Sequence, residues 1–331
     1  MTASGRAIAV AHPNIALIKY WGNLDSELRI PTNGSISMTL SGLQTKTSVR
    51  FDPQAAEDQV LIDRRPAPPE ARRRVVRILD RVRLLSSLPH RAHVESVNSF
   101  PSDAGIASSA SAFAALAAAA VAAAGLDMEP RALSRLARLG SGSACRSVYG
   151  GFVEWLAGAD DDSSYALQIA PPEHWQVRDV VAIVSREQKK VGSSEGHRLA
   201  ATSPRQFARV QDAPRRLDAC RRAILARDFE ALADIVEEDS RLMHDVMKTS
   251  VPPLDYSSPL TVQLLREIPD WRAQGLAVAY TQDAGPNLHL LCLASAAEQV
   301  SQRLRKTQGV LDVLLAGPGT PPEILEDDLS G

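Results

Sequence analysis

Several segments of the chain show the alternation or the apolar runs that are typical of strands. "TKTSVRF", residues 45–51, alternates polar and apolar positions and predicts a half-buried strand after a loop, "RIPTNGSIS". "VRDVVAIVS", residues 177–185, is apolar and β-branched, which predicts a buried strand. "LAVAYTQDAGPNLHLLCLA", residues 276–294, predicts two strands joined by a Gly-Pro turn. Both halves of the chain should therefore contribute strands to a sheet.

Other segments repeat apolar residues at helical spacing. Residues 69–88 carry Val75, Val76, Leu79 and Val82 on one face of a basic amphipathic helix. Its arginines could contact nucleic acid, but no aromatic residues accompany them, so we interpret them as a solvated face. The remaining predicted helices span residues 130–139 and one or two helices within 215–247, before a C-terminal helix, a strand and a frayed tail.

Composition limits the architecture and the partners. The 331 residues suggest two domains, and the composition shift before "VRDVVAIVS" places them at residues 1–180 and 181–331. A net charge of −2 supplies no field that would attract nucleic acid or an anionic membrane. The alanine-rich stretch at residues 109–126 is too weakly apolar for a membrane span.

The three cysteines and the N-terminus point to a reducing compartment. Cys145, Cys220 and Cys292 are odd in number and lie far apart, which argues against a disulfide framework or a zinc site. No apolar signal segment opens the chain, so we expect a cytoplasmic protein.

The clearest chemical signal is "FPSDAGIASSAS", which runs directly into the alanine-rich helix. Such an arrangement aims backbone N–H groups and the positive end of a helix dipole at one point, as phosphate binding requires. Gly105 and Ala107 leave room for an anion, and Ser108 and Ser109 add hydroxyl groups, with Ser108 a candidate Mg²⁺ ligand. An ordinary serine-capped helix is the alternative, and the Walker A pattern is absent. Asp103 would repel a phosphate unless it faces away or helps to hold Mg²⁺.

This loop resembles the phosphate-binding motif of the galactokinase, homoserine kinase, mevalonate kinase and phosphomevalonate kinase superfamily. With "NIALIKYWGN", "PTNGSIS", "RLGSGSACRSVYGGFVEW" and "YTQDAGPN" in the same order, the chain is similar to the mevalonate diphosphate decarboxylase family from about residue 10 to 315. The resemblance implies an α+β fold of two domains, in which a nucleotide-binding domain and a ferredoxin-like domain enclose the active site in a cleft. It also implies ATP and Mg²⁺ as cofactors and a homodimer.

Enzymes of the family phosphorylate the tertiary 3-hydroxyl of a 5-phosphorylated mevalonate and then release phosphate and CO₂ together. By resemblance, Asp283 orients or deprotonates that hydroxyl, although an Asx-turn is the alternative from spacing alone. Lys19 would lie beside it and depress the pKa of the carboxylate. Arg146 would bind the substrate carboxylate, Asn14 the carboxylate or the reacting oxygen, and Ser193 the nucleotide phosphates or that oxygen.

The resemblance also assigns the phosphate contacts. For the 5-phosphate of the substrate we expect Tyr20, Ser141, Gly142, Ser143 and Arg146. For the nucleotide we expect Ser96, Asn98, Pro101, Ala104, Gly105, Ala107, Ser108 and Ser109. A serine-glycine turn without function would explain "GSGS" equally well, and Cys145 between these residues lacks a histidine that could activate it as a nucleophile.

Two positions depart from the family pattern at the end of the substrate that carries its terminal phosphate. The family has a lysine and an arginine where this chain has Asn23 and Ser194, the latter within "KKVGSSEGH". Two lost charge-assisted contacts would weaken a diphosphate by roughly 3 to 6 kcal/mol. The sequence therefore favours mevalonate 5-phosphate as the substrate and isopentenyl phosphate as the product.

The alternative is that other cations compensate and the substrate is the 5-diphosphate, with Arg186, Lys189 and Lys190 as candidates. A kinase that stops at the 3-phosphate is less consistent with Lys19 and Asp283. A non-catalytic metabolite-binding protein is less consistent with the complete set of catalytic residue types.

Overall fold

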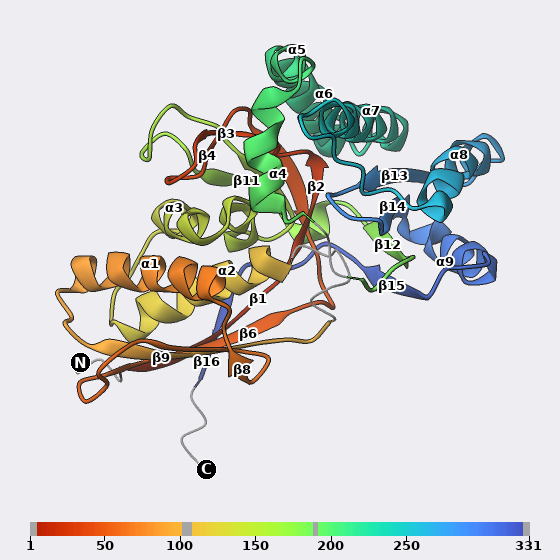
Figure 1. Ribbon diagram of the computed structural model, residues 1–331. Coiled ribbons are helices and arrows are strands. Elements are labelled where there is room, and N and C mark those ends of the chain that lie inside the picture. Colours follow the sequence, from red (N-terminus) through yellow and green to blue (C-terminus); the bar gives the residue numbers. More distant parts are fainter. Residues whose placement is uncertain (1–4, 101–107, 188–190, 327–331) are drawn as a thin grey trace.

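The structure is a computed structural model that describes residues 5–100, 108–187 and 191–326. Helices and largely antiparallel sheets make up the described part of the chain, with one parallel strand pair between β7 and β9, which confirms the predicted α+β class. In Figure 1 a helix-covered sheet at the N-terminal end of the chain stands beside a smaller sheet that is flanked by the C-terminal helices.

The largest sheet has the order β16-β1-β6-β9-β7-β8. Burial alternates strictly along β6, as the pattern of "TKTSVRF" predicts. The prediction of a frayed tail is wrong for residues 323–325, because β16 pairs with β1 and returns the chain to the N-terminal sheet. The strands are β1 (Arg6–Ala11), β6 (Thr45–Asp52), β7 (Gln59–Ile62), β8 (Arg65–Pro66), β9 (Arg91–Asn98) and β16 (Glu323–Leu325).

A layer of helices α1 (Pro69–Ser86), α2 (Ser108–Ala123) and α3 (Pro130–Gly140) covers this sheet (Figure 1). Alanine side chains make up most of the buried face of α2, so the helix can approach β1 and β6 closely. On α1 the buried apolar residues are Val75, Ile78, Leu79 and Val82, so Ile78 takes the position in the core that we assigned to Val76. Arg83 is also buried, which the interpretation of the arginines as a solvated face did not foresee. Within the described residues, no helix combines the length and the apolar character that a membrane crossing requires.

A second sheet, in the order β11-β10-β5-β2, lies in the middle of the molecule. The loop predicted for "RIPTNGSIS" is wrong in part, because β5 pairs with both β10 and β2 and all five of its residues are buried. The apolar pattern failed here because serine and threonine occupy buried positions. The strands are β2 (Asn14–Ile18), β5 (Ser35–Thr39), β10 (Phe152–Trp155) and β11 (Ala166–Ala170), with the pair β3 (Asn23–Asp25) and β4 (Ile30–Pro31) nearby.

The third sheet has the order β13-β14-β12-β15, and each neighbouring pair is antiparallel. With helices between its strands, this order is that of the ferredoxin-like fold that the resemblance implies. The strands are β12 (Val177–Ile183), β13 (Val278–Gln282), β14 (Leu288–Leu293) and β15 (Asp312–Ala316). The predicted division between residues 180 and 181 falls within β12 and stays a prediction.

The C-terminal half also contributes the helices that lie above the central sheet. Helices α6 and α7 pack against each other, and α7 also packs on β13 and β2. They resolve residues 215–247 into two helices. The elements are α4 (Ser193–Leu199), α5 (Gln206–Gln211), α6 (Ala213–Ala226), α7 (Phe229–Lys248), α8 (Pro259–Ala273) and α9 (Ala297–Lys306), with 3₁₀ turns η1 (Gly142–Val148), η2 (Pro172–His174), η3 (Ala200–Thr202) and η4 (Ala294–Ala296).

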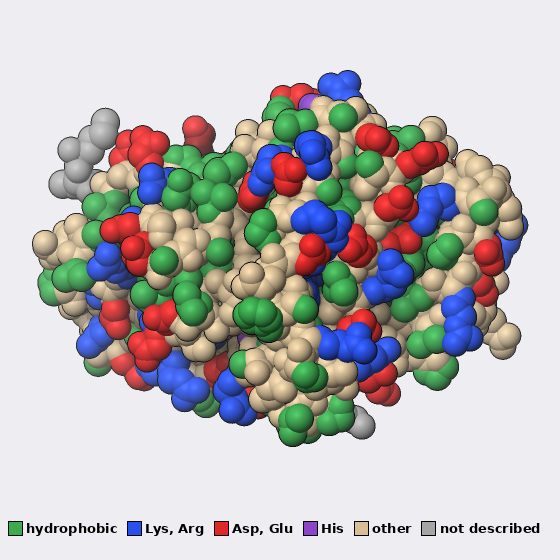
Figure 2. Space-filling view, turned by 90° about the horizontal axis from the view of Figure 1, so that it is seen from above, with side chains coloured by type: hydrophobic (Ala, Val, Ile, Leu, Met, Phe, Trp, Pro, Cys, Tyr) green, Lys and Arg blue, Asp and Glu red, His purple; other side chains and the backbone are tan. Residues whose placement is uncertain are grey.

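Acidic and basic side chains are interspersed on the face seen in Figure 2, and neither sign forms a broad patch there. The appearance of this face agrees with the formal net charge of −2. On this face, any binding of an anion would therefore depend on local groups rather than on a broad charged patch.

Candidate active site

A cavity of about 640 Å³ lies where the helical layer, the central sheet and α4 meet. Its wall includes residues from segments that are far apart in the sequence, between position 14 and position 284. Twelve predicted site residues contribute to it: Asn14, Lys19, Tyr20, Ser108, Ser109, Ser141, Gly142, Ser143, Arg146, Ser193, Ser194 and Asp283.

Lys19 and Asp283 form an ion pair in this wall. Lys19 follows β2 and Asp283 follows β13, and Lys19 Nζ lies 2.5 Å from Asp283 Oδ1. The lysine side chain is 1% exposed, whereas the aspartate is 25% exposed, so the carboxylate is the member of the pair that can reach a bound molecule. The carboxylate of Asp283 thus contacts a cation, beyond any part it plays in the turn before Gly285.

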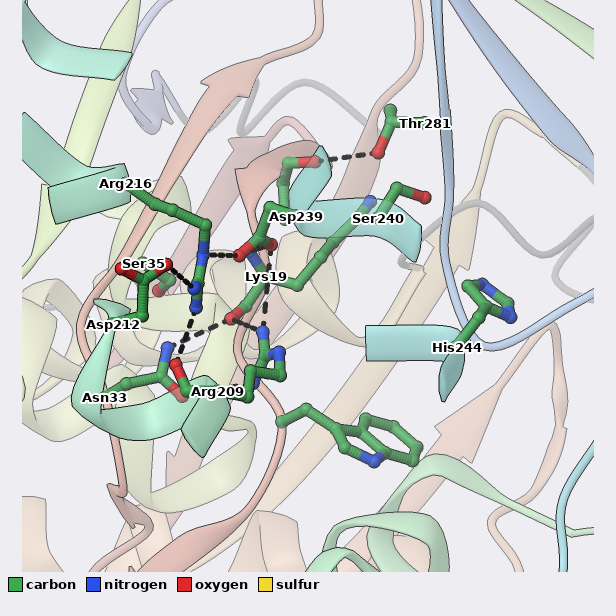
Figure 3. Close-up of polar contacts among 12 residues, drawn as sticks. Lys19, Asn33, Ser35, Arg209, Asp212, Arg216, Asp239, Ser240, His244 and Thr281 are labelled. Carbon is green, nitrogen blue, oxygen red and sulfur yellow. Dashed lines mark hydrogen bonds and ion pairs between the residues drawn. The ribbon is translucent and has the colours of Figure 1, made fainter. Parts of the chain in front are cut away.

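A second carboxylate holds the main chain of Lys19 (Figure 3). Asp239 on α7 accepts the Lys19 N–H through Oδ2 at 2.6 Å and the Arg216 Nε–H through Oδ1 at 2.8 Å. Arg209 and Asn33 donate to the Lys19 carbonyl oxygen at 2.8 and 3.1 Å. Both polar atoms of the Lys19 main chain are hydrogen-bonded, so the main chain is fixed and the side chain starts from a constant position as it extends to Asp283. Sequence reasoning missed this arrangement, because it joins the residue after β2 and a residue between β4 and β5 to residues of α5, α6 and α7.

Arg146, on η1, lines the cavity together with Asn14 of β2. Its guanidinium donates to Ser35 Oγ at 2.5 Å and to Asn14 Oδ1 at 3.1 Å, and Asn14 in turn donates to Ser147 Oγ at 2.8 Å. Burial lowers the pKa of Arg146, but guanidinium groups keep their proton in proteins. Its fully buried Nε makes no hydrogen bond within the described part of the chain. The group lines the cavity and is therefore a fixed cation that a bound carboxylate can meet.

Hydroxyl groups form a short row beside the N-terminus of α2. Ser141 Oγ lies 3.1 Å from Ser109 Oγ and 3.3 Å from Ser143 Oγ. A glycine is required at position 142, between Ser141 and Ser143, because a Cβ there would meet the Tyr20 side chain at 2.6 to 2.8 Å. Tyr20 therefore packs directly on the backbone of this segment, and the row of hydroxyls can donate to a phosphate.

Several of the predicted nucleotide contacts lie away from the cavity or beyond the described residues. Ser96 Oγ pairs with Thr47 Oγ1 at 3.0 Å, and Asn98 Oδ1 accepts from Thr45 Oγ1 at 2.6 Å. Neither Ser96 nor Asn98 lines the cavity. The residues Pro101, Asp103, Ala104, Gly105, Ala107, Lys189 and Lys190 lie outside the described residues.

The two positions that depart from the family pattern are placed differently. Ser194 lines the cavity, whereas Asn23 on β3 stands behind Tyr20 and accepts a hydrogen bond from its hydroxyl group. Burial raises the pKa of Tyr20 well above its usual value, so this hydroxyl keeps its proton and donates it to Asn23. Arg186, one of the candidate compensating cations, pairs with Asp312 at 3.1 Å and does not line the cavity.

Two cavity arginines were missed by the sequence. Arg29 precedes β4 and Arg74 projects from α1. Both line the cavity, and each donates through Nε to a carbonyl at the C-terminal end of α3, Arg29 to Leu139 and Arg74 to Gly140. Burial, followed by repulsion from Arg29, lowers the pKa of Arg74 to about 10. We interpreted the arginines of α1 as a solvated face, which is wrong for Arg74 because it also stacks on Phe113 at 4.5 Å. Only the relation between α1, α2 and α3 could have revealed it.

Cys145 is a buried structural residue. It is fully buried beside Arg146, and burial raises the pKa of its thiol to about 12. Because the thiolate is the nucleophilic form, this position is inert at neutral pH, as the sequence predicts. Within the described residues, no group of three or more His, Cys, Asp or Glu side chains could hold a metal ion.

Comparison with known proteins identifies the family that the sequence motifs indicate, along nearly the whole chain. The family model described as Diphosphomevalonate decarboxylase-like N-terminal domain matches residues 11–166, and the one described as Mevalonate 5-diphosphate decarboxylase C-terminal domain matches residues 179–313. Diphosphomevalonate decarboxylase of Homo sapiens is 39% identical over 302 residues, covering 85% of this chain and 75% of the relative. The enzyme of Aspergillus fumigatus is 37% identical over 328 residues, covering 92% of this chain and 81% of the relative.

Solved structures agree with this similarity. Mevalonate diphosphate decarboxylase from Staphylococcus aureus superposes with a TM-score of 0.93 at 35% identity, covering 97% of this chain and 98% of that one. A structure described as MDDEF in complex with MVAPP, AMPPCP and magnesium gives a TM-score of 0.90 at 35% identity, covering 97% and 99%.

Proposed function

Because the chain belongs to the diphosphomevalonate decarboxylase family, we propose that it converts mevalonate 5-diphosphate and ATP into isopentenyl diphosphate, ADP, phosphate and CO₂. Membership agrees with the family that the sequence motifs indicate. Whether the substrate has one or two phosphates at the 5-position must be decided by the residues of the cavity. Here the relatives favour the diphosphate, against the monophosphate that the sequence favours.

The observation that carries the proposal is the pair Arg29 and Arg74. They bring two guanidinium groups into the cavity wall, beyond Lys19 and Arg146, and neither forms an ion pair with an acid of the described residues. Arg29 is close enough to Tyr20 to oppose the rise in the pKa of its phenol. The two arginines thus lie near Tyr20 and Asn23, and Asn23 is the position at which the family pattern has a lysine. Two fixed cations can replace the two that the family pattern would supply.

The residues also fit a nucleotide and its metal ion. Ser108 and Ser109 begin the long helix α2 and line the cavity, which places hydroxyl oxygens and a helix N-terminus beside the space for phosphate. Ser108 is the candidate Mg²⁺ ligand, and Mg²⁺ takes most of its remaining ligands from phosphates and water. Bound ATP supplies the phosphoryl group, and bound Mg²⁺ neutralises charge on its phosphates. A structure of a related enzyme is described with AMPPCP and magnesium.

Different residues of the chain then act on the 3-hydroxyl, the carboxylate and the 5-phosphate of the substrate. Asp283 accepts the proton of the 3-hydroxyl or orients it, while Lys19 holds Asp283 in place and balances the charge that accumulates near it. Arg146, fixed by Ser35 and Asn14, binds the substrate carboxylate until it departs as CO₂. Ser141 and Ser143 donate to the 5-phosphate, and Ser193 covers the cavity from α4.

The experiment that tests the substrate is a comparison of kcat/KM for mevalonate 5-phosphate and mevalonate 5-diphosphate with the wild-type enzyme at saturating ATP and Mg²⁺. A preference for the diphosphate is expected. A clear preference for the monophosphate would show that Asn23 and Ser194 decide the specificity and that the product is isopentenyl phosphate. A homodimer and a cytoplasmic location stay predictions, and size-exclusion chromatography with light scattering tests the first.

A further inference from the structure

His197 is a buried side chain of the cavity wall to which neither the motifs nor the mechanism above gives a role. It lies on α4, at the end of "KKVGSSEGH", and is 9% exposed. Its ring stacks on Tyr20 with centroids 4.0 Å apart and an angle of 29°, and it also packs on Trp21 at 4.7 Å. Gly196 makes this approach possible, because a Cβ there would meet the Trp21 ring at 2.4 Å.

A hydrogen bond to the main chain fixes the tautomer of the ring. The Gly22 N–H points at His197 Nδ1 at 3.0 Å. A backbone amide can only donate, so Nδ1 must be the unprotonated acceptor, and the proton of a neutral ring is on Nε2. Burial, and then the charges of Arg29, Arg209 and Arg146, lower the pKa of His197 to about 3, which keeps the ring neutral at physiological pH.

The His197 ring exposes to the cavity the edge that carries Nε2. Nδ1 is bonded to Gly22, and Tyr20 and Trp21 cover the ring, yet His197 contributes to the cavity wall. Within the described residues, no hydrogen bond from Nε2 is formed, and Nε2 is not among the fully buried polar atoms that lack a partner. The donor therefore faces the space that the cavity offers to a ligand.

We infer that His197 donates an Nε2–H hydrogen bond to the terminal phosphate of the substrate and thereby contributes to the choice of a diphosphate. The inference rests on the proposed function. Two donors then meet at this end of the cavity: the neutral imidazole of His197, which rests on the Tyr20 ring, and the guanidinium of Arg29, which is near enough to lower the pKa of the imidazole. Because the ring is neutral at every working pH, its Nε2–H is always available to a phosphate. A histidine that binds phosphate as a cation loses that charge above its pKa.

Two substitutions separate the two nitrogens of the ring. His197→Asn keeps an acceptor near the position of Nδ1 for the Gly22 N–H and removes the Nε2 donor. His197→Gln places an amide N–H near the position of Nε2. We expect His197→Asn to raise KM for mevalonate 5-diphosphate about 10-fold with little change in KM for ATP, and His197→Gln to recover part of the loss, since one hydrogen bond to a charged group is worth about that factor. His93→Asn, on β9 outside the cavity, should match the wild type.

Equal losses in His197→Asn and His197→Gln, or equal increases in KM for ATP and for the substrate, would show a packing role and overturn the inference. A wild-type preference for the monophosphate would instead overturn the proposed function, and it is seen before any variant is made.

Nuclear magnetic resonance of the wild-type enzyme with ¹⁵N-labelled histidine tests the same inference without relying on folded variants. The His197 signals should show a protonated Nε2 and an unprotonated Nδ1, and addition of mevalonate 5-diphosphate should shift the Nε2 signal. Inorganic pyrophosphate serves as a second probe, which reports on phosphate binding even if the substrate is the monophosphate. The opposite tautomer, or an Nε2 signal unmoved by saturating amounts of both probes, would overturn the inference.

Discussion

Lys19 Nζ lies 2.5 Å from Asp283 Oδ1, although 264 positions separate the two residues in the sequence. β2 and β13 belong to different sheets, so the pair forms where the central sheet and the third sheet meet. The lysine is buried and the aspartate partly exposed. An exposed carboxylate backed by a buried cation is an arrangement suited to a proton transfer at the substrate.

Substitution of the cation should slow the reaction with little effect on binding. We predict that Lys19→Met lowers kcat about 10²- to 10⁴-fold, the range expected when a proton-transfer group loses its charged neighbour. Methionine retains the volume of the buried stem and removes the charge. The control is Lys46→Met, at an exposed position of β6, which should match the wild type. A kcat in Lys19→Met within threefold of the wild type would contradict the role assigned to the pair.

The cluster behind Lys19 should show its importance in stability. Asp239 is fully buried between Arg216 and Arg209, so Asp239→Asn leaves the buried Arg209 without its acidic partner and leaves Arg216 with Asp212 alone. We predict a loss of about 3 to 5 kcal/mol in the free energy of unfolding, measured by urea denaturation. Asp218→Asn breaks only exposed pairs on α6 and should cost less than about 1 kcal/mol. Similar losses in the two variants would show that the cluster is not the anchor described here.

The two missed arginines should decide how well the diphosphate binds. We predict that Arg29→Gln and Arg74→Gln each raise KM for mevalonate 5-diphosphate about 10- to 100-fold, because each removes a charged donor. KM for the 5-phosphate should rise less. Arg73→Gln, an exposed neighbour on the same helix α1, provides the matched control and should leave both constants unchanged. Equal effects on both substrates would place these arginines away from the terminal phosphate.

A buried histidine should make the protein less stable in acid. His244 on α7 is 8% exposed, and burial lowers its pKa from 6.5 to about 4. Below pH 6.5 the unfolded chain takes up a proton at this position that the folded protein does not, so the free energy of unfolding falls as the pH is lowered towards 4. His244→Gln should reduce that slope by up to about 1.4 kcal/mol per pH unit. An unchanged slope in denaturation curves between pH 6.5 and 4.5 would contradict this prediction.

Much of the fold follows from periodicity, and its failures have physical causes. The alternation in β6 and the helical spacing in α3 and α7 predict those elements because each has one face in the core. β5 escaped prediction because Ser35, Ser37 and Thr39 are buried hydroxyl residues in the middle of a sheet. β16 escaped because its partner β1 lies at the opposite end of the chain.

The candidate site divides in a similar way. Residues carried by motifs, such as Lys19, Arg146 and Asp283, could be named from the sequence and do line one cavity. Arg29, Arg74 and His197 belong to segments whose local pattern suggests a turn, a solvated helix face and a structural histidine. Only the packing of α1, α3 and α4 around Tyr20 brings them to the cavity, and no spacing rule contains that information.

The most direct test of the central claim measures ADP and CO₂ together in one assay with mevalonate 5-diphosphate, ATP and Mg²⁺, using the wild type and Asp283→Asn. The account predicts one CO₂ for each ADP in the wild type and the loss of both products in Asp283→Asn, with nucleotide binding retained. ADP without CO₂ in the wild type, or near-normal CO₂ release by Asp283→Asn, would contradict it.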